Sequence, residues 1–252
     1  MHIVLSNDDG IQARGIHALA QALAARGHRV TVSAPDRERS CSGHALSLRE
    51  PLYAREAAGW AGFSAYEVSG TPADCAKLGI ENLAGAPVDL MVAGINHGSN
   101  LGSDTLYSGT VSAAMEAALM GYPALAVSLA SDECMDFSVA AEIAADVVEW
   151  MRTRALGGRV LNLNVPPLAR EKILGIRAAP LALRRYLGGY EKRQAPIGRT
   201  YYLINSHLQA QLIEPGTDAA LVEAGYCTLT PLDWRLGHAA ALIQLQGDMP
   251  AL

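Results

Sequence analysis

Two adjacent acidic residues follow the first apolar segment of the chain, in the stretch VLSNDDG. That segment, residues 2–6, is short and β-branched, which is typical of a buried parallel strand. Asp8 and Asp9 therefore lie where the strand ends, and Gly10 permits a turn that brings both carboxylates toward one point. Two ionised carboxylates this close must share a proton or bind a cation. Ordinary turn chemistry is the alternative, with Asp8 capping the next helix and Asp9 solvated.

Two later polar loops supply further oxygen atoms at the same edge of the predicted sheet. Ser40 lies in the loop after the second predicted strand, and Asn96 opens the loop after a buried strand at 88–95. Together with the acid pair they form a set of oxygen ligands, which suits Mg²⁺ or Mn²⁺ better than Zn²⁺. Taken singly, Ser40 and Asn96 are also ordinary turn residues.

A third segment, YSGTVSAAMEA, predicts an anion site. Ser108, Gly109 and Thr110 stand where a helix begins, and the unpaired N–H groups and helix dipole there favour a phosphate. Gly109 is expected to let the phosphate approach the backbone. Asn96, which opens the preceding loop, and Asn100 are both expected to donate hydrogen bonds to phosphoryl oxygens. A simple N-cap at Ser108 is the alternative, and Tyr107 is a candidate for stacking on a base or for core packing.

Strands and helices alternate over the first two thirds of the chain. Helices are predicted at 15–27, 70–83, 110–121 and 137–153, and strands at 2–6, 28–35, 65–70, 88–95, 123–130 and 159–167. Thr71, Pro72 and Asp74 match a capping box with proline at the first helical position. This alternation predicts a doubly wound α/β core, in which ligands bind at the carboxyl ends of the strands.

The alternation weakens after Pro167. We therefore expect a core at 1–167 that binds metal and phosphate, and an extension at 168–252 that is not an independent domain. The extension contains a strand-like stretch at 199–205, a helix and strand at 217–232, and a short helix near 238–246. Arg184 and Arg185 form a basic pair that either reaches toward substrate, contacts another subunit or is solvated.

Composition narrows the class of protein. The chain has 252 residues, of which half are hydrophobic, and a formal net charge of -5. This mild acidity argues against a nucleic acid polymer as partner. The four cysteines are scattered and form no CxxC pair, which indicates reduced thiols. No apolar run approaches the roughly 18 residues of a membrane span and no signal peptide is recognisable, so we expect a cytoplasmic protein with no membrane partner.

Five motifs together resemble the SurE family (survival protein E) of metal-dependent nucleoside monophosphate phosphatases. They are SNDDGIQARGI (6–16), APDRERSCSGHALS (34–47), GTPADC (70–75), GINHGSNLG (94–102) and SGTVSAAMEA (108–117). The similarity continues more loosely to the segment at 223–232, and therefore covers nearly the whole chain in the family's order.

The resemblance implies a fold, an activity and a ligand set. The fold is a Rossmann-like, three-layer, mostly parallel sheet, with a C-terminal hairpin extension that builds a homodimer or homotetramer. The activity is hydrolysis of nucleoside 5′-monophosphates, and also of 3′-nucleotides and short polyphosphate. One divalent metal ion per subunit, Mg²⁺ or Mn²⁺, is held by four residues: Asp8, Asp9, Ser40 and Asn96. Because other residues also occur at the position of His97 in the family, we expect no catalytic role for this histidine.

In this interpretation Asp8, Asp9 and Asn96 are the catalytic residues, and a metal-activated water attacks phosphorus. Which of the two acids steers the water or accepts its proton is left open.

Direct attack by an aspartate, as in haloacid-dehalogenase-like phosphatases, requires acids two residues apart rather than adjacent. A receiver domain is much shorter than this chain and needs a lysine that the strand at 123–130 lacks. A nucleotide-sugar glycosyltransferase needs two full lobes of this kind, on the order of 350 residues.

Overall fold

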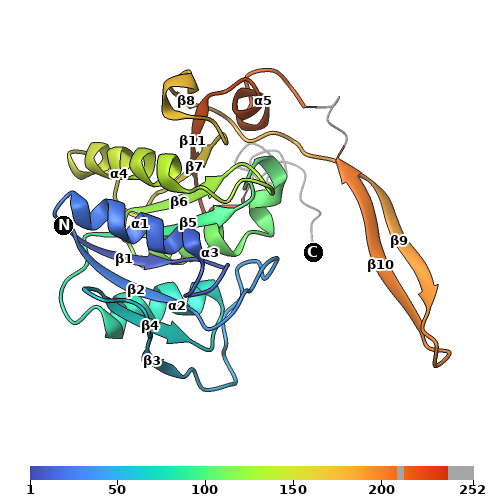
Figure 1. The fold of residues 1–252 in the computed structure, drawn as a ribbon, viewed down its shortest axis with the longest axis horizontal. Coiled ribbons are helices and arrows are strands. Elements are labelled where there is room, and N and C mark those ends of the chain that lie inside the picture. The colour runs from blue at the N-terminus through green and yellow to red at the C-terminus, as the bar shows by residue number, and fades with distance from the viewer. Residues whose placement is uncertain (209–212, 238–252) are drawn as a thin grey trace, which may run out of the picture.

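The computed structural model describes residues 1–208 and 213–237 (Figure 1). Nine strands of these residues form one sheet, in the order β3-β4-β2-β1-β5-β6-β7-β11-β8. The middle strands run parallel: β4 (Ser64–Val68), β2 (Arg29–Pro35), β1 (His2–Ser6), β5 (Leu90–His97), β6 (Ala124–Leu129) and β7 (Val160–Val165). The outer strands are β3 (Ala54–Glu56), antiparallel to β4, β11 (Cys227–Leu232), antiparallel to β7, and β8 (Ile176–Ala178), parallel to β11. The predicted mostly parallel α/β sheet is confirmed.

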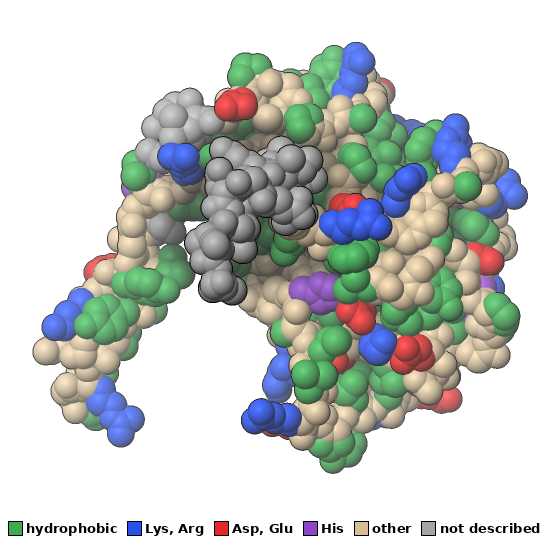
Figure 2. Space-filling model, turned by 180° about the vertical axis from the view of Figure 1, so that it is seen from behind, with side chains coloured by type: hydrophobic (Ala, Val, Ile, Leu, Met, Phe, Trp, Pro, Cys, Tyr) green, Lys and Arg blue, Asp and Glu red, His purple; other side chains and the backbone are tan. Residues whose placement is uncertain are grey.

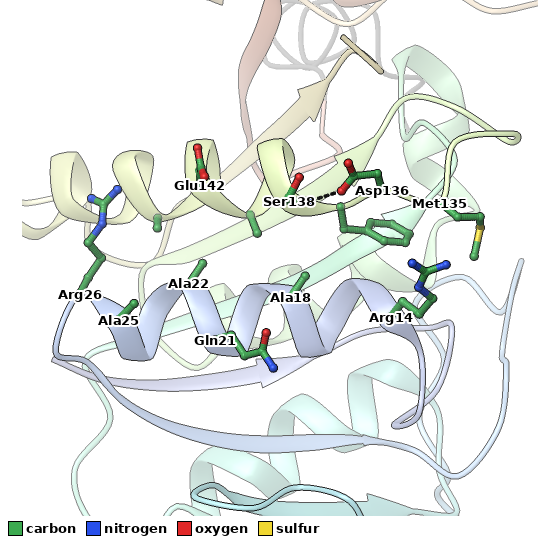
Figure 3. Close-up of a pocket in the computed structure, with 13 residues that line it drawn as sticks. Arg14, Ala18, Gln21, Ala22, Ala25, Arg26, Met135, Asp136, Ser138 and Glu142 are labelled. Carbon is green, nitrogen blue, oxygen red and sulfur yellow. Dashed lines mark hydrogen bonds between the residues drawn. The ribbon is translucent and has the colours of Figure 1, made fainter. Parts of the chain in front are cut away.

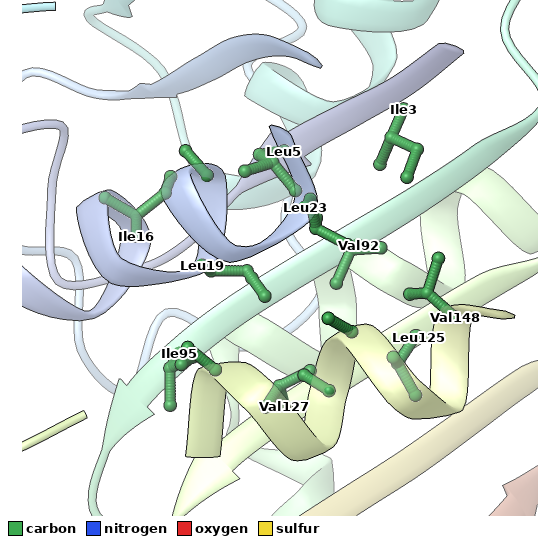
Figure 4. Packing of buried hydrophobic residues seen from close by; sticks show 14 of the residues in the cluster. Ile3, Leu5, Ile16, Leu19, Leu23, Val92, Ile95, Leu125, Val127 and Val148 are labelled. Carbon is green, nitrogen blue, oxygen red and sulfur yellow. The ribbon is translucent and has the colours of Figure 1, made fainter. Parts of the chain in front are cut away.

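Helices cover both faces of this sheet and make the fold a three-layer, doubly wound one. Helices α1 (Arg14–Ala25) and α4 (Ser138–Arg152) pack on one face, and α2 (Pro72–Leu78) and α3 (Gly109–Leu119) on the other. Leu19 and Leu23 of α1 belong to the same buried cluster as Val92 of β5 (Figure 4). Burial of each such side chain contributes about 1.5–3 kcal/mol to the stability of the fold. This packing therefore holds the strands, and with them the strand ends, in place.

The capping box predicted for α2 is present. The Thr71 hydroxyl accepts a hydrogen bond from the Asp74 N–H at 3.1 Å, and the Asp74 carboxylate accepts one from the Thr71 N–H at 2.9 Å. The helix continues as a π-helical turn over Gly79–Leu83. The Asp74 carboxylate also accepts a hydrogen bond from the Ser47 hydroxyl at 2.7 Å, which fastens the end of the loop that carries Ser40 to this helix.

The C-terminal extension contributes to the main sheet and also leaves it. Strands β8 and β11 complete one edge of the sheet, beside helix α5 (Asp218–Glu223). Strands β9 (Tyr186–Gln194) and β10 (Thr200–Leu208) form a separate antiparallel hairpin that projects from the body (Figure 1). The expected strand-like stretch at 199–205 lies mostly within β10, and the helix and strand expected at 217–232 are α5 and β11. The helix expected near 238–246 lies outside the described residues.

Two further observations concern the cysteines and the helix lengths. No disulfide joins any of the four cysteines. In residues 1–208 and 213–237, no helix has both the length and the apolar character needed to cross a bilayer.

Candidate metal and phosphate site

The strand order reverses direction between β1 and β5. From β1 the chain passes through α1 to β2 on one side, and it later returns to β5 on the other side of β1. Ligands of open α/β sheets bind in the crevice outside such a reversal, at the carboxyl ends of the strands. Asp8 and Asp9 follow β1 there, and Asn96 lies near the end of β5. Gly10 adopts a φ of 97°, as the predicted turn after the acid pair requires.

A pocket of about 350 Å³ opens at this edge. It is lined by Asp8, Cys41, Asn96, Ser99, Asn100, Asp104, Tyr107, Ser108 and Tyr186. The structure therefore brings together four residues that were predicted from separate motifs: Asp8, Asn96, Asn100 and Ser108. The other four predicted site residues, Asp9, Ser40, Gly109 and Thr110, stand outside this lining.

Asp8 is a buried carboxylate, with 5% of its surface exposed. The hydroxyl of Thr110, which is fully buried on α3, donates a hydrogen bond to it. Burial raises the pKa of Asp8, while the Thr110 hydroxyl and the backbone N–H groups of Gly109 and Thr110 offset part of that shift. The predicted phosphate-binding turn is thus the group that holds the first acid.

Asp9 is less deeply buried and shares the electrostatic environment of its neighbour. Burial, followed by the charge of Asp8, raises the pKa of Asp9 to about 6. The backbone N–H of His97 donates a hydrogen bond to Asp9 at 3.1 Å and lowers the pKa in part, while Glu38 raises it. A carboxylate pair of this kind is stabilised by a proton or by a cation, as the sequence suggested.

The loop that carries Ser40 lies directly against the first acid. The Arg39 N–H donates a hydrogen bond to the backbone carbonyl of Asp8 at 2.7 Å. Ser40 itself is exposed, and its hydroxyl donates to the Glu38 carboxylate at 2.7 Å. The residue after it, Cys41, lines the pocket. Ser40 therefore stands beside the pocket, and its oxygen lone pairs are free to accept a cation.

The donor set at this edge fits a hard divalent cation. The Asn96 amide nitrogen donates to the Gly98 carbonyl at 2.8 Å, which makes the Asn96 amide oxygen the atom that could accept a cation. Within the described part of the chain, no three side chains of His, Cys, Asp or Glu gather as a metal-binding group. The candidate ligands that accompany Asp8 and Asp9 are instead an amide oxygen and a hydroxyl oxygen, the ligand type that Mg²⁺ and Mn²⁺ accept.

The first turn of α3 serves two purposes that the sequence left open. The Ser108 hydroxyl accepts a hydrogen bond from the Val111 N–H at 3.0 Å, so Ser108 is the N-cap of the helix. Gly109 was expected to make room for a phosphate. In the structure a β-carbon at Gly109 would stand 2.7 Å from the Asp8 β-carbon and 3.0 Å from Pro72 Cγ, so the glycine is needed first for the approach of Asp8 itself.

Asn100 is held by hydrogen bonds with residues that were not predicted from the sequence. Asn162 and Asn164 of β7 make hydrogen bonds to the main chain of Asn100, and its side-chain amide donates to Ser128 at 2.8 Å. All three partners are fully buried. The signal in the sequence is the pair of asparagines in NLNV, since asparagine is unusual inside a buried strand.

Asp104 also lines the pocket without having been predicted as a site residue. Arg184 pairs with its carboxylate at 2.7 Å, and the Tyr186 hydroxyl donates to the same carboxylate. Arg184 is therefore an intramolecular partner of the pocket wall, while Arg185 is exposed. Burial and the Asp104 hydrogen bond raise the pKa of Tyr186 to about 12.

A larger pocket of about 590 Å³ lies between α1 and α4 (Figure 3). Alanines of both helices form its walls, with Arg14, Gln21 and Glu142 at its rim. It contains none of the predicted site residues. We therefore place the candidate functional site at the smaller pocket, which Asp8, Asn96, Asn100 and Ser108 line.

The fold and the site define a class: a doubly wound α/β protein with an acidic, oxygen-rich pocket at the reversal of strand order. Comparison with known families narrows that class, because the model for "Survival protein SurE" matches residues 3–188. The chain belongs to the SurE family.

Individual relatives match over nearly the full length. A protein of Synechococcus sp. strain JA-3-3Ab named 5′-nucleotidase SurE is 46% identical, with 98% of this chain and 96% of the relative covered. A protein of Gloeobacter violaceus with the same name is 45% identical, with 94% and 92% covered. The solved structure of the SurE protein from Aquifex aeolicus matches with a TM-score of 0.85 and 35% identity, covering 99% of this chain and all of that one.

Proposed function

We propose that this protein is a metal-dependent phosphomonoesterase that hydrolyses nucleoside 5′-monophosphates to nucleoside and phosphate. The relatives named 5′-nucleotidase support the reaction. The observation that carries the proposal is the acid pair, in which buried Asp8 and partly buried Asp9 meet at the reversal of strand order. Both carboxyl groups have raised pKa values there, as expected where a cation normally compensates their charge.

One divalent ion per subunit, Mg²⁺ or Mn²⁺, is proposed to be held by four residues: Asp8, Asp9, Ser40 and Asn96. When bound, such an ion neutralises charge on phosphoryl oxygens and lowers the pKa of a coordinated water. Thr110 keeps Asp8 oriented toward the site through its hydroxyl. One of the two acids, Asp8 or Asp9, would steer the attacking water or accept its proton.

The substrate phosphate is proposed to be bound by the asparagines and by the first turn of α3. Asn96 and Asn100 line the pocket together with Ser108. Helix α3 begins at Gly109, directly after Ser108, so the positive end of its dipole lies beside this residue of the lining, while the N–H groups of Gly109 and Thr110 serve Asp8. Hydrogen bonds from the two asparagines and from Ser108 to phosphoryl oxygens would stabilise the charge that develops in the transition state.

The nucleoside is proposed to lie against the aromatic part of the pocket. Tyr107 and Tyr186 line it and remain 66% and 47% exposed, so that their rings are available for stacking on a base. Stacking tolerates every base, so we expect little preference among bases. We also propose 3′-nucleotides and short polyphosphate as secondary substrates, as the family resemblance implies.

The projecting hairpin supports a proposed homodimer or homotetramer, and the location that we propose for it is the cytoplasm. An isolated two-stranded hairpin is marginally stable in water. Strands β9 and β10 nevertheless expose apolar side chains (Figure 2), and their pairing puts Tyr190, Tyr202 and Ile204 on one face of the hairpin. Burial of this ladder against a second copy would complete the hairpin. Light scattering coupled to size exclusion, compared between the full chain and a variant without residues 187–207, measures this directly.

The experiment that tests the proposed activity is phosphate release from a panel of nucleoside monophosphates, 3′-nucleotides and polyphosphate. Each substrate is assayed with Mg²⁺, with Mn²⁺ and with EDTA, for wild type and for Asp8→Asn. We expect release from 5′-monophosphates that needs the metal and is abolished by the substitution. Equal release in EDTA would contradict the metal dependence, and no release from any monophosphate would contradict the reaction.

A further inference from the structure

Strand β7 contains two asparagines at positions where an apolar side chain is usual. Asn162 and Asn164 are both fully buried, and their neighbours in the strand are leucine and valine. Burying an amide costs about 1–3 kcal/mol for each group that finds no partner. Asn162 Oδ1 has no partner among the described residues, so the strand retains this asparagine although one of its polar atoms remains unsatisfied.

Both asparagines are directed at the same peptide groups. Asn164 accepts a hydrogen bond from the Asn100 N–H at 2.9 Å and donates one to the Asn100 carbonyl at 3.0 Å. Asn162 donates a second one to that carbonyl at 2.8 Å. The Asn164 side-chain amide thus makes the two hydrogen bonds that the main chain of a neighbouring strand would make with Asn100, although Asn100 lies in a loop. The main chain of Asn100 has both polar groups satisfied by side chains.

This pairing fixes the loop that forms one wall of the pocket. Ser99, Asn100, Asp104 and Tyr107 all line the pocket from this loop. The Asn100 side-chain amide meets the Ser128 hydroxyl at 2.8 Å. Since a hydroxyl can donate as well as accept, Asn100 can present either its oxygen or its nitrogen to a ligand without losing this contact.

We propose that Asn162 and Asn164 are positioning residues for phosphate binding, which hold the main chain of Asn100 so that its side chain stays directed into the pocket. The proposal rests on the proposed function, because it takes Asn100 as a phosphate ligand. It deepens that function by assigning a role to β7, a strand that contributes no side chain to the pocket lining. Neither asparagine contacts the phosphate, so both act through Asn100 alone.

The test compares Asn162→Leu and Asn164→Leu, which keep the side-chain volume and remove the hydrogen bonds. Calorimetry measures the affinity for inorganic phosphate in the presence of Mn²⁺, and electron paramagnetic resonance measures the affinity for Mn²⁺ alone. Losing the hydrogen bonds that hold Asn100 is expected to weaken phosphate binding by about threefold in Asn162→Leu and about tenfold in Asn164→Leu. The affinity for Mn²⁺ is expected to change by less than about twofold, since neither residue contacts a predicted ligand of the metal.

The matched control is Thr228→Val. Thr228 pairs with Asn164 across the strands, is fully buried, and has a hydroxyl with no partner among the described residues. Its substitution is expected to leave both affinities unchanged. In combination with Asn100→Ala, the Asn164→Leu effect should disappear, because the two act through one side chain.

Three results would overturn the proposal. They are unchanged phosphate affinity in folded Asn164→Leu, a full effect of Asn164→Leu in the Asn100→Ala background, and a rapidly exchanging Asn100 amide proton in wild type. The exchange rate of the Asn100 amide proton is measured on wild type, and therefore tests the positioning role even where the leucine variants do not fold. If wild type with Mn²⁺ binds no phosphate at all, the proposed function fails as well, whereas normal wild-type binding with an unaffected Asn164→Leu refutes the positioning role alone.

Discussion

Gly109 lies so close to Asp8 that a β-carbon on the glycine would stand 2.7 Å from the Asp8 β-carbon and 3.0 Å from Asp8 Oδ2. The first turn of α3 therefore closes directly over the first acid. This contact explains why the carboxylate is buried, and why hydrogen bonds from the start of the helix counteract part of the resulting rise in its pKa. The metal site and the phosphate site expected from separate motifs thus share one structural element.

Substitution of Gly109 by alanine is expected to displace Asp8 from the site. Alanine is the better residue for a helix by about 1 kcal/mol, so any loss reflects the contact rather than helix propensity. We expect the affinity for Mn²⁺ to fall by about tenfold or more, as for other displaced supports of a metal ligand. Gly189→Ala is the control, because a β-carbon there meets nothing within 4 Å. Equal Mn²⁺ affinity in the two variants would show that Asp8 does not hold the metal.

The acid pair predicts a dependence of stability on pH in the metal-free protein. The pKa of Asp9 is about 6 in the folded protein, against 3.8 as the ordinary value. Between these values the folded protein holds a proton that the unfolded chain has lost, so the free energy of unfolding decreases as the pH rises through this window. Thermal unfolding should show this decrease in wild type and a smaller one in Asp9→Asn.

Mn²⁺ should reverse that trend, because it binds the deprotonated pair. The rise in melting temperature on adding Mn²⁺ is expected to be larger at about pH 7.5 than at about pH 5. A rise that is equal at both pH values would mean that the cation binds without displacing protons, and therefore away from Asp8 and Asp9.

The hydrogen bond from the Thr110 hydroxyl predicts a shift in the pH dependence of Mn²⁺ binding. Thr110→Val keeps the shape of the side chain and removes the hydrogen bond to Asp8. Since that hydrogen bond lowers the pKa of Asp8, its loss should raise the pKa further and move the pH at which Mn²⁺ binding is half-maximal upward. Thr110→Ser should restore the wild-type profile, because serine retains the hydroxyl. A loss of affinity that is the same at every pH would indicate general damage to the helix instead.

Asp74 is expected to contribute to stability at a distance from the pocket. Only 4% of its surface is exposed, and it accepts hydrogen bonds from both Thr71 and Ser47. Asp74→Asn should lower the free energy of unfolding by about 1–3 kcal/mol, because a buried amide cannot accept all of these hydrogen bonds. Urea denaturation measures the change. Asp233→Asn, at an exposed site, serves as the control, and a comparable loss in both variants would remove the capping role.

Much of this fold follows from the spacing of apolar residues and from the caps. The parallel strands, the four helices of the core and the capping box at Thr71 and Asp74 were all predicted, since each depends on neighbours in sequence. The meeting of Asp8, Asn96, Asn100 and Ser108 in one pocket also follows from local patterns. Strand ends in a doubly wound sheet converge at one edge, so each motif needed only to be placed at the end of its own strand.

Other features depend on contacts between distant segments, which local spacing does not specify. The pairing of Asp104 with Arg184 joins the pocket wall to the base of the hairpin, about 80 residues later in the chain. The place of β11 beside β7 depends on the same long return of the chain. Gly109 was assigned to phosphate approach because a glycine at a helix start suggests it, but only the approach of the first turn of α3 to the segment after β1 reveals the contact with Asp8.

The central claim is that one divalent cation binds at this edge of the sheet and serves phosphate ester hydrolysis. The most direct measurement is an anomalous difference map from crystals of wild type soaked in MnCl₂. We predict one peak per subunit within about 2.3 Å of carboxylate oxygens of Asp8 and Asp9, close to Asn96, and no peak in Asp8→Asn. A map without a peak at the acid pair, together with hydrolysis of AMP that is insensitive to EDTA, would contradict the claim.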